Sequence, residues 1–155
     1  MSDFSTLIAR AEALLARLEA VLPQPPAAPD WSASIAFRYR RRGTGGGVLE
    51  PVRHVAPLRL ADLKEVDGQK ERLVRNTAQF VAGRPANNVL LTGARGTGKS
   101  SLIKACLNEF ADRGLRLIEV DKDDLTDLPD LVALVGERPE RFIIYCDDLS
   151  FDEGE

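Results

Sequence analysis

The stretch that decides the fold reads VLLTGARGTGKSSLIKA and spans residues 89–105. Within it, Gly93 is followed by four residues and then by Gly98, Lys99 and Ser100, a spacing typical of loops that hold phosphate. The apolar run before this loop predicts a strand, and the amphipathic run after it predicts a helix. Because this is the context that the pattern requires, we interpret the loop as a phosphate-binding site rather than a glycine-rich turn without a ligand.

The residue types in this loop suit an oxyanion. Gly93, Gly96 and Gly98 permit backbone angles that other residues resist, and they leave room for close approach. Backbone N–H groups between Ala94 and Ser100 can then point inward as an anion nest, at the positive end of the following helix. We expect the nucleotide-binding residues to be Gly93, Ala94, Arg95, Gly96, Thr97, Gly98, Lys99, Ser100 and Ser101.

Two further roles belong to charged or hard oxygen groups. The ammonium group of Lys99 is a mobile charge for the β and γ phosphates, and the Ser100 hydroxyl is a hard oxygen ligand for Mg²⁺. A carboxylate is also needed at the metal, and FIIYCDD, residues 142–148, provides Asp147 and Asp148 where a strand ends. We expect Asp147 to hold Mg²⁺ through water and Asp148 to polarise the attacking water, so that Lys99 and Asp148 are the candidate catalytic residues. Without the loop, the same acids would only solvate a strand end.

The choice of nucleotide follows from the motifs that are present and absent. A GTPase should contain Asn-Lys-x-Asp, with Asp-x-x-Gly after the second strand, and the sequence has neither. Small-molecule kinases of this loop type lack the doubled acid after the third strand, and no acceptor-binding motif is visible. We therefore expect an ATPase, although Asp148 is one methylene shorter than the glutamate that many ATPases have at this position.

Composition and charge limit the class of protein. The chain has 155 residues, 44% hydrophobic and 29% charged, as expected for one soluble globular domain. Its net charge is −3, so no overall basic field attracts nucleic acid. Cys106 and Cys146 fall in apolar segments and are expected to be buried, reduced thiols, which favours a cytoplasmic protein. We predict no signal peptide, no membrane-spanning segment and no membrane partner.

Residues 1–30 are predicted to form an amphipathic helix followed by a stiff, proline-rich linker. The apolar residues of the helix form a one-sided stripe: Phe4, Leu7, Ile8, Ala11, Leu14, Leu15, Leu18, Val21 and Leu22. Such a stripe needs a partner, which is either the chain's own domain or another subunit or protein.

Residues 31–60 are predicted to form a β-hairpin. Alternating residues from Trp31 to Tyr39 indicate one strand, the glycine-rich residues 43–47 a turn, and residues 48–55 a returning strand. Basic residues gather at the tip: Arg38, Arg40, Arg41 and Arg42. We interpret them as a solvated edge that deters strand pairing, and a contact with an anion or with nucleic acid is the alternative.

Residues 61–155 are predicted to form a partial ATPase core of the α/β class. Strands are expected at residues 87–92, 115–120 and 141–146, the last buried on both faces. Helical patterns precede and separate them, at residues 69–81, 98–114 and 125–139. Strands that alternate with helices predict a parallel sheet.

Four segments carry a resemblance to a known family: GARGTGKSS, LIEVDKDDL, RPERFIIYCDDLSF and the upstream VDGQKERLVRNTAQFVAGRPANNVLLTG. From about Asp30 onward, the chain resembles a bacterial AAA+ ATPase family of the domain-of-unknown-function type. Residues 93–100 resemble its Walker A loop, Asp147 with Asp148 resembles Walker B, and the turn at residues 65–69 resembles the stretch near the adenine.

This resemblance implies a P-loop NTPase fold of the AAA+ type, a three-layer sandwich around a parallel sheet. It implies ATP and Mg²⁺ as cofactors, and hydrolysis coupled to conformational work on an unknown protein client. It also implies a homo-oligomer. The sheet order in this class is 5-1-4-3-2, so that strand 4 lies between the strand before the loop and the strand before Asp147.

By this resemblance the chain supplies strands 1, 2 and 3, whereas the polar sensor, the arginine finger and the helical lid follow beyond Glu155 in the family. We therefore expect an N-terminal fragment that ends just after Walker B, binds nucleotide weakly and does not hydrolyse it efficiently. The competing hypothesis is a non-hydrolysing, nucleotide-dependent adaptor or loader. It would hold a protein or nucleic-acid partner through the N-terminal helix and the arginine tip.

Overall fold

The structure, a computed structural model of the 155-residue chain, describes all residues except 1, 22–28, 42–46, 95 and 148–155. Its helices are α1 (Ser2–Val21), α2 (Asp67–Val81), α3 (Lys99–Phe110) and α4 (Leu128–Val135). Its strands are β1 (Ala36–Arg41), β2 (Gly47–Pro51), β3 (Leu115–Glu119) and β4 (Arg141–Tyr145). Short 3₁₀ turns occupy Leu60–Asp62, Ala111–Arg113 and Lys122–Asp127.

The four strands form one mixed sheet in the order β2-β1-β3-β4. β1 and β2 pair antiparallel as the predicted hairpin, whereas β1 pairs parallel with β3, and β3 parallel with β4. Parallel neighbours need a crossover connection, and α4 lies in the one between β3 and β4. The α/β class is confirmed. The sheet is mixed rather than parallel because the hairpin joins it through β1.

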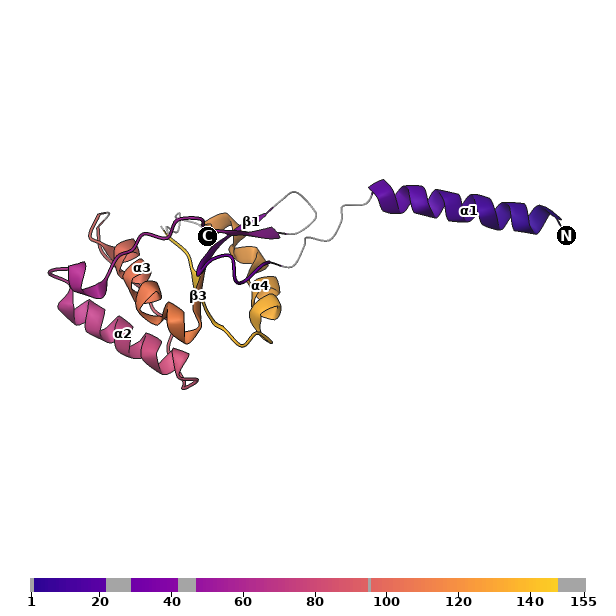
Figure 1. The fold of residues 1–155 in the computed structure, drawn as a ribbon. Helices are drawn as coiled ribbons and strands as arrows, with labels where there is room; N and C mark the ends of the chain where they lie inside the picture. The colour runs from indigo at the N-terminus through magenta and orange to yellow at the C-terminus, as the bar shows by residue number, and fades with distance from the viewer. Residues whose placement is uncertain (1, 22–28, 42–46, 95, 148–155) are drawn as a thin grey trace.

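Helices cover both faces of this sheet (Figure 1). On one face, α2 and α3 pack over a cluster that includes Leu73 and Leu117. On the other face, Leu131 of α4 meets Phe37 and Ile118. Consecutive residues of β3 therefore enter opposite clusters, which is why this strand reads as a continuous apolar run.

Aromatic residues attach the hairpin to the core. Trp31 precedes β1 in the chain and is not part of the strand. Its ring packs edge-on against Phe37 and Phe142, at centroid distances of 4.9 and 4.8 Å. The Tyr39 hydroxyl donates to Asp127 Oδ2 at 2.9 Å, so the buried carboxylate has a partner. Burial is the main reason that the pKa of Tyr39 rises to about 12.

The strand expected at residues 87–92 is not formed. A strand needs a neighbour for its N–H and C=O groups, and within the described residues no strand pairs with this segment. At one residue of this segment, the side chain of Asn76 in α2 replaces the missing strand partner. Asn76 Nδ2 donates to the Asn87 carbonyl at 2.8 Å, and Asn76 Oδ1 accepts from the Asn87 N–H at 3.0 Å. Val89 and Leu90 remain 48% and 76% exposed.

The prediction for residues 141–146 is correct for the strand and wrong for its burial. β4 lies at the edge of the sheet, and residues 142–146 are half-buried. Cys106 is buried as expected, and burial raises the pKa of its thiol. Cys146 is only half-buried, because it follows this edge strand. Both thiols are free.

The helix predicted at the N-terminus forms, but the described core does not cover its stripe. Phe4, Leu7 and Leu14 are 73%, 65% and 59% exposed. Packing of the stripe against the chain's own domain is therefore not what the described structure shows. No helix among the described residues is long and apolar enough to cross a lipid bilayer.

Candidate nucleotide-binding site

The loop before α3 follows a path that favours glycine at three positions. The backbone angle φ is 141° at Gly93, 83° at Gly96 and 84° at Gly98, where an L-residue would be strained. At Gly93 an added Cβ would also come within 3.2 Å of Thr97 Oγ1. The glycines therefore adopt the angles that the sequence pattern predicted. Arg95 lies outside the described residues.

Two side chains of the loop bond to its own carbonyl groups. Thr97 Oγ1 donates to the Ala94 carbonyl at 2.8 Å. Lys99 Nζ donates to the carbonyls of Gly93, at 2.7 Å, and Ala94, at 3.0 Å. The ammonium group thus lies against the loop backbone. It can exchange these neutral acceptors for a phosphate oxygen, because a hydrogen bond between two charged groups is stronger.

The first turn of α3 directs its N–H groups toward the same loop. Gly98 caps this helix of 12 residues, and the Leu102 N–H donates to the Gly98 carbonyl at 2.9 Å. The N–H groups of Lys99, Ser100 and Ser101 therefore have no acceptor inside the helix. Together with the positive end of the helix dipole, they favour an anion at this place.

Ser100 connects the loop to the end of β4. Its Oγ donates to Asp147 Oδ2 at 2.9 Å, across 47 positions of sequence. The Tyr145 hydroxyl, from the last residue of β4, donates to Ser100 Oγ at 3.1 Å. Desolvation is the largest cause that raises the pKa of Tyr145, to about 12, and a side-chain hydrogen bond with Asp147 raises it further. The structure thus brings together the two predicted metal ligands.

The register of the sheet fixes where Asp147 lies. Glu119 of β3 pairs with Tyr145, and the Val120 N–H donates to the Tyr145 carbonyl at 2.9 Å, so pairing continues to the last residue of β4. Asp147 follows two residues later, at the carboxyl end of the strand. In open α/β sheets this is the end at which ligands bind.

The protein ligands for a metal ion are few. The described residues contain no group of three or more His, Cys, Asp or Glu side chains that could hold a metal. The hydroxyl of Ser100 and the carboxylate of Asp147 are nevertheless the hard oxygen donors that Mg²⁺ prefers, and this ion usually keeps water and phosphate as its other ligands. The donor set therefore fits Mg²⁺ bound together with a nucleotide. Asp148 lies outside the described residues, and its role as a base stays a prediction.

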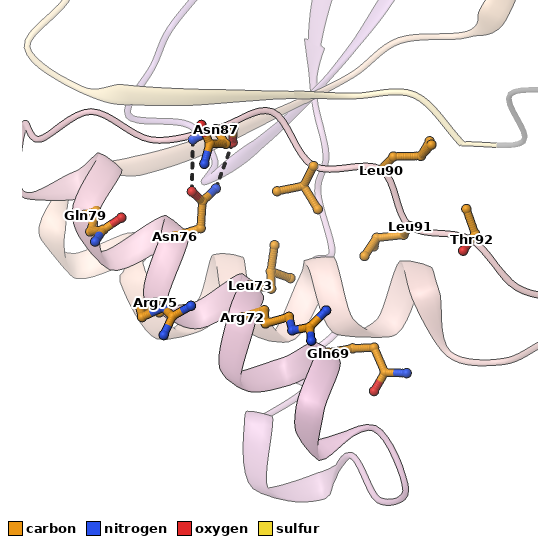
Figure 2. Close-up of a pocket in the computed structure, with 11 residues that line it drawn as sticks. Gln69, Arg72, Leu73, Arg75, Asn76, Gln79, Asn87, Leu90, Leu91 and Thr92 are labelled. Atoms are coloured by element: carbon orange, nitrogen blue, oxygen red, sulfur yellow. Dashed lines mark hydrogen bonds between the residues drawn. The ribbon is translucent and has the colours of Figure 1, made fainter.

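A groove of about 750 Å³ lies between α2 and residues 87–92 (Figure 2). Thr92, at one end of the groove, directly precedes the phosphate loop, and Gln69 and Leu91 lie at this same end. The lining combines amide and guanidinium groups of α2 with apolar side chains, a mixture that suits a ring with polar edges. The Asn76–Asn87 pair holds the two walls together at the other end.

The described arginines of the hairpin face carboxylates. The pairs are Arg38 with Glu119 at 2.9 Å, Arg40 with Glu50 at 4.0 Å, and Arg41 with Asp127 at 3.4 Å. These partners offset the positive charge, which disfavours an anion contact. The expectation of a sheet edge is wrong for these arginines, because β1 lies between β2 and β3. Arg42 lies outside the described residues.

The sequence reasoning missed two residues that shape the site. Tyr145 lies two positions before Asp147 in an extended segment, so both side chains share a face. The two-residue period of a strand could therefore have identified Tyr145 from the sequence. No sequence pattern identifies Asn76, because its role depends on Asn87, which only the fold places beside it.

Comparisons with known proteins support a family assignment. A family model described as "Protein of unknown function (DUF815)" matches residues 32–155. The expected likeness to a family of the domain-of-unknown-function type is therefore confirmed. No curated protein and no solved structure matched the chain.

Proposed function

The chain belongs to the family described as protein of unknown function DUF815, and from this premise we propose that it is an ATP-binding protein of the P-loop NTPase class, of the AAA+ type, that takes up ATP together with Mg²⁺. The proposal includes ATP hydrolysis as the activity of the family, with Asp148 as the base. A homo-oligomer that acts on a protein client belongs to the same proposal.

The observation that carries the proposal is the hydrogen bond between Ser100 Oγ and Asp147 Oδ2, at 2.9 Å. A phosphate loop alone can bind many anions. A hydroxyl in the first turn of α3 that meets a carboxylate beyond β4 is the specific pairing that a magnesium nucleotide needs.

The residues divide the work of binding. Backbone N–H groups of the loop and of the first turn of α3 hold the phosphate oxygens. Lys99 gives up its two carbonyl acceptors for the β and γ phosphates. Ser100 and Asp147 hold Mg²⁺, and the ion, when bound, offsets the negative charge of the triphosphate.

The groove beside Thr92 supports a place for the nucleoside. It begins where the phosphate loop begins, and its polar edge includes Gln69 in the first turn of α2, within residues 65–69 that resemble the stretch near the adenine. The base would lie between α2 and residues 87–92, with Leu91 as an apolar contact.

The experiment is calorimetric titration of the chain with ATP and GTP, in Mg²⁺ and in EDTA. We expect Mg²⁺-dependent uptake of ATP, and a loss of about 10- to 100-fold in affinity for Lys99→Ala, because a charge-assisted hydrogen bond is lost. Lys104→Ala is the matched control, since Lys104 is an exposed lysine of α3 beyond the first turn. No uptake of either nucleotide, or equal losses in the two variants, would contradict the proposal.

Turnover separates the two functional hypotheses. Hydrolysis that Asp148→Asn abolishes, with ATP affinity retained, supports an ATPase. In a chain extended to the full length of the family, ATP-dependent capture of a protein or nucleic-acid partner without turnover supports the non-hydrolysing adaptor or loader instead.

A further inference from the structure

We propose that Tyr145 is a positioning residue of the magnesium site: its hydroxyl orients Ser100 Oγ so that one lone pair of that oxygen faces the metal. The inference rests on the proposed function, because it concerns how the same site takes Mg²⁺. It adds a residue outside the phosphate-binding pattern and outside the acidic pair.

Tyr145, Ser100 and Asp147 form a row of hydrogen-bonded oxygens at the site. A carboxylate can only accept, so Ser100 Oγ must donate its single proton to Asp147 Oδ2, over 2.9 Å. Ser100 then has no proton left for Tyr145. The Tyr145 hydroxyl is therefore the donor in the 3.1 Å contact with Ser100 Oγ, and the Asp147 carboxylate is a second acceptor for the same proton.

These two hydrogen bonds leave Ser100 Oγ with little remaining acceptor capacity. A serine hydroxyl has one proton and two lone pairs. Asp147 takes the proton and Tyr145 takes one lone pair, so a single lone pair of Ser100 Oγ is left. Because the two hydrogen bonds fix the rotation of the hydroxyl, this lone pair has one direction. The hydroxyl can bind a hard cation through it while it keeps both hydrogen bonds.

The surroundings of Tyr145 hold this donor in place. The ring of Tyr145 packs against the cluster beneath α2 and α3, and its carbonyl is bonded to the Val120 N–H at 2.9 Å. A donor held in this way loses little conformational freedom when the metal arrives. A serine on this half-buried first turn without such a donor would have to lose its hydroxyl rotation on binding.

The test compares two tyrosine-to-phenylalanine variants. Tyr145→Phe removes the hydroxyl at the site, and Tyr39→Phe removes the hydroxyl that bonds to Asp127 in the core, away from the loop. For each we would measure ATP affinity in EDTA and in Mg²⁺ by calorimetry. The ratio of the two affinities reports on the metal site and not on general stability.

We expect Tyr145→Phe to lower this ratio about 3- to 10-fold, the worth of one hydrogen bond, with the affinity in EDTA unchanged. Tyr39→Phe should leave the ratio unchanged. In a Ser100→Ala background, Tyr145→Phe should have no further effect on the ratio, because the oxygen that it orients is gone.

An unchanged ratio in Tyr145→Phe overturns the inference and leaves the proposed function intact. An equal loss in EDTA and in Mg²⁺ also overturns it, because a purely structural role would weaken both. If the unaltered chain shows no Mg²⁺-dependent uptake of ATP, the proposed function fails, and the inference fails with it.

Discussion

Single residues decide whether the phosphate loop can exist. Gly98 has a φ of 84°, with no atom of the chain near the position that a Cβ would take, so the folded chain itself needs glycine there only for the backbone angle. Gly68, in the first turn of α2, has equally open surroundings and lacks that left-handed angle. Comparing substitutions at the two glycines therefore isolates the effect of the backbone angle from any effect of steric crowding.

We expect Gly98→Ala to lower the free energy of unfolding by about 1–2 kcal/mol, the cost of a left-handed L-residue. Gly68→Ala should raise it by about 0.5–1 kcal/mol, because alanine favours a helix and restricts the unfolded chain. Urea unfolding of both variants measures the difference. Gly98→Ala as stable as the unaltered chain would show that the loop takes another path.

The buried pair of Tyr39 and Asp127 gives stability a dependence on pH. The pKa of Tyr39 rises from 10.0 to about 12, so the folded chain holds the phenol proton more tightly than the unfolded chain does. This contribution is fully present below pH 10 and is lost as the pH rises toward about 12. The difference in unfolding free energy between the unaltered chain and Tyr39→Phe should shrink over this interval. Chemical unfolding at several alkaline pH values measures it, and a constant difference would contradict the assignment.

At the scale of an element, α1 is the helix whose apolar face lacks a cover in the described structure. Phe4, Leu7, Ala11 and Leu14 follow the alternating spacing of three and four residues found in coiled coils. Their exposure, together with the proposed homo-oligomer, favours a second copy of α1 as the partner.

We therefore expect the chain to associate through α1. Leu7→Glu with Leu14→Glu should shift the chain to monomer, because two charges would enter the apolar seam. Ala9→Glu with Ala13→Glu, on the opposite face of the same helix, is the matched control and should leave the assembly unchanged. Sedimentation analysis measures the outcome. A monomer in the unaltered chain would contradict the expectation.

At the scale of the whole molecule, the proposed site lies between two parts of the fold. The loop belongs to the segment held by α2 and α3, and Asp147 follows the edge strand β4. A ligand that contacts both parts should stabilise their packing together, in addition to filling the site.

Thermal unfolding should therefore respond to the complete ligand. At an ATP concentration 100 times the dissociation constant, stabilisation should reach about 2.7 kcal/mol in Mg²⁺. Asp147→Asn should lose most of the benefit of Mg²⁺, because the neutral amide is a weaker metal ligand. Calorimetric melting with ATP, in EDTA and in Mg²⁺, measures the effect. Equal melting temperatures with and without ATP would contradict the site.

The sequence by itself determined the elements whose patterns are local. The glycine spacing fixed the left-handed angles of the loop, because only residues without Cβ adopt them freely. Apolar periodicity gave α1, α2, α3 and the parallel pair β3–β4. It also placed Ser100 at the start of a helix and Asp147 at the end of a strand.

Only the tertiary structure decided which backbone segments pair with one another as strands. Residues 87–92 have the composition of a strand, yet a strand exists only where a neighbour accepts its hydrogen bonds, and no strand among the described residues pairs with this segment. The contacts of Ser100 with Asp147 and Tyr145 arise in the same way, across more than 40 positions that no local pattern relates. Pairing over such distances depends on how the whole chain packs, and for that reason it was decided by the fold.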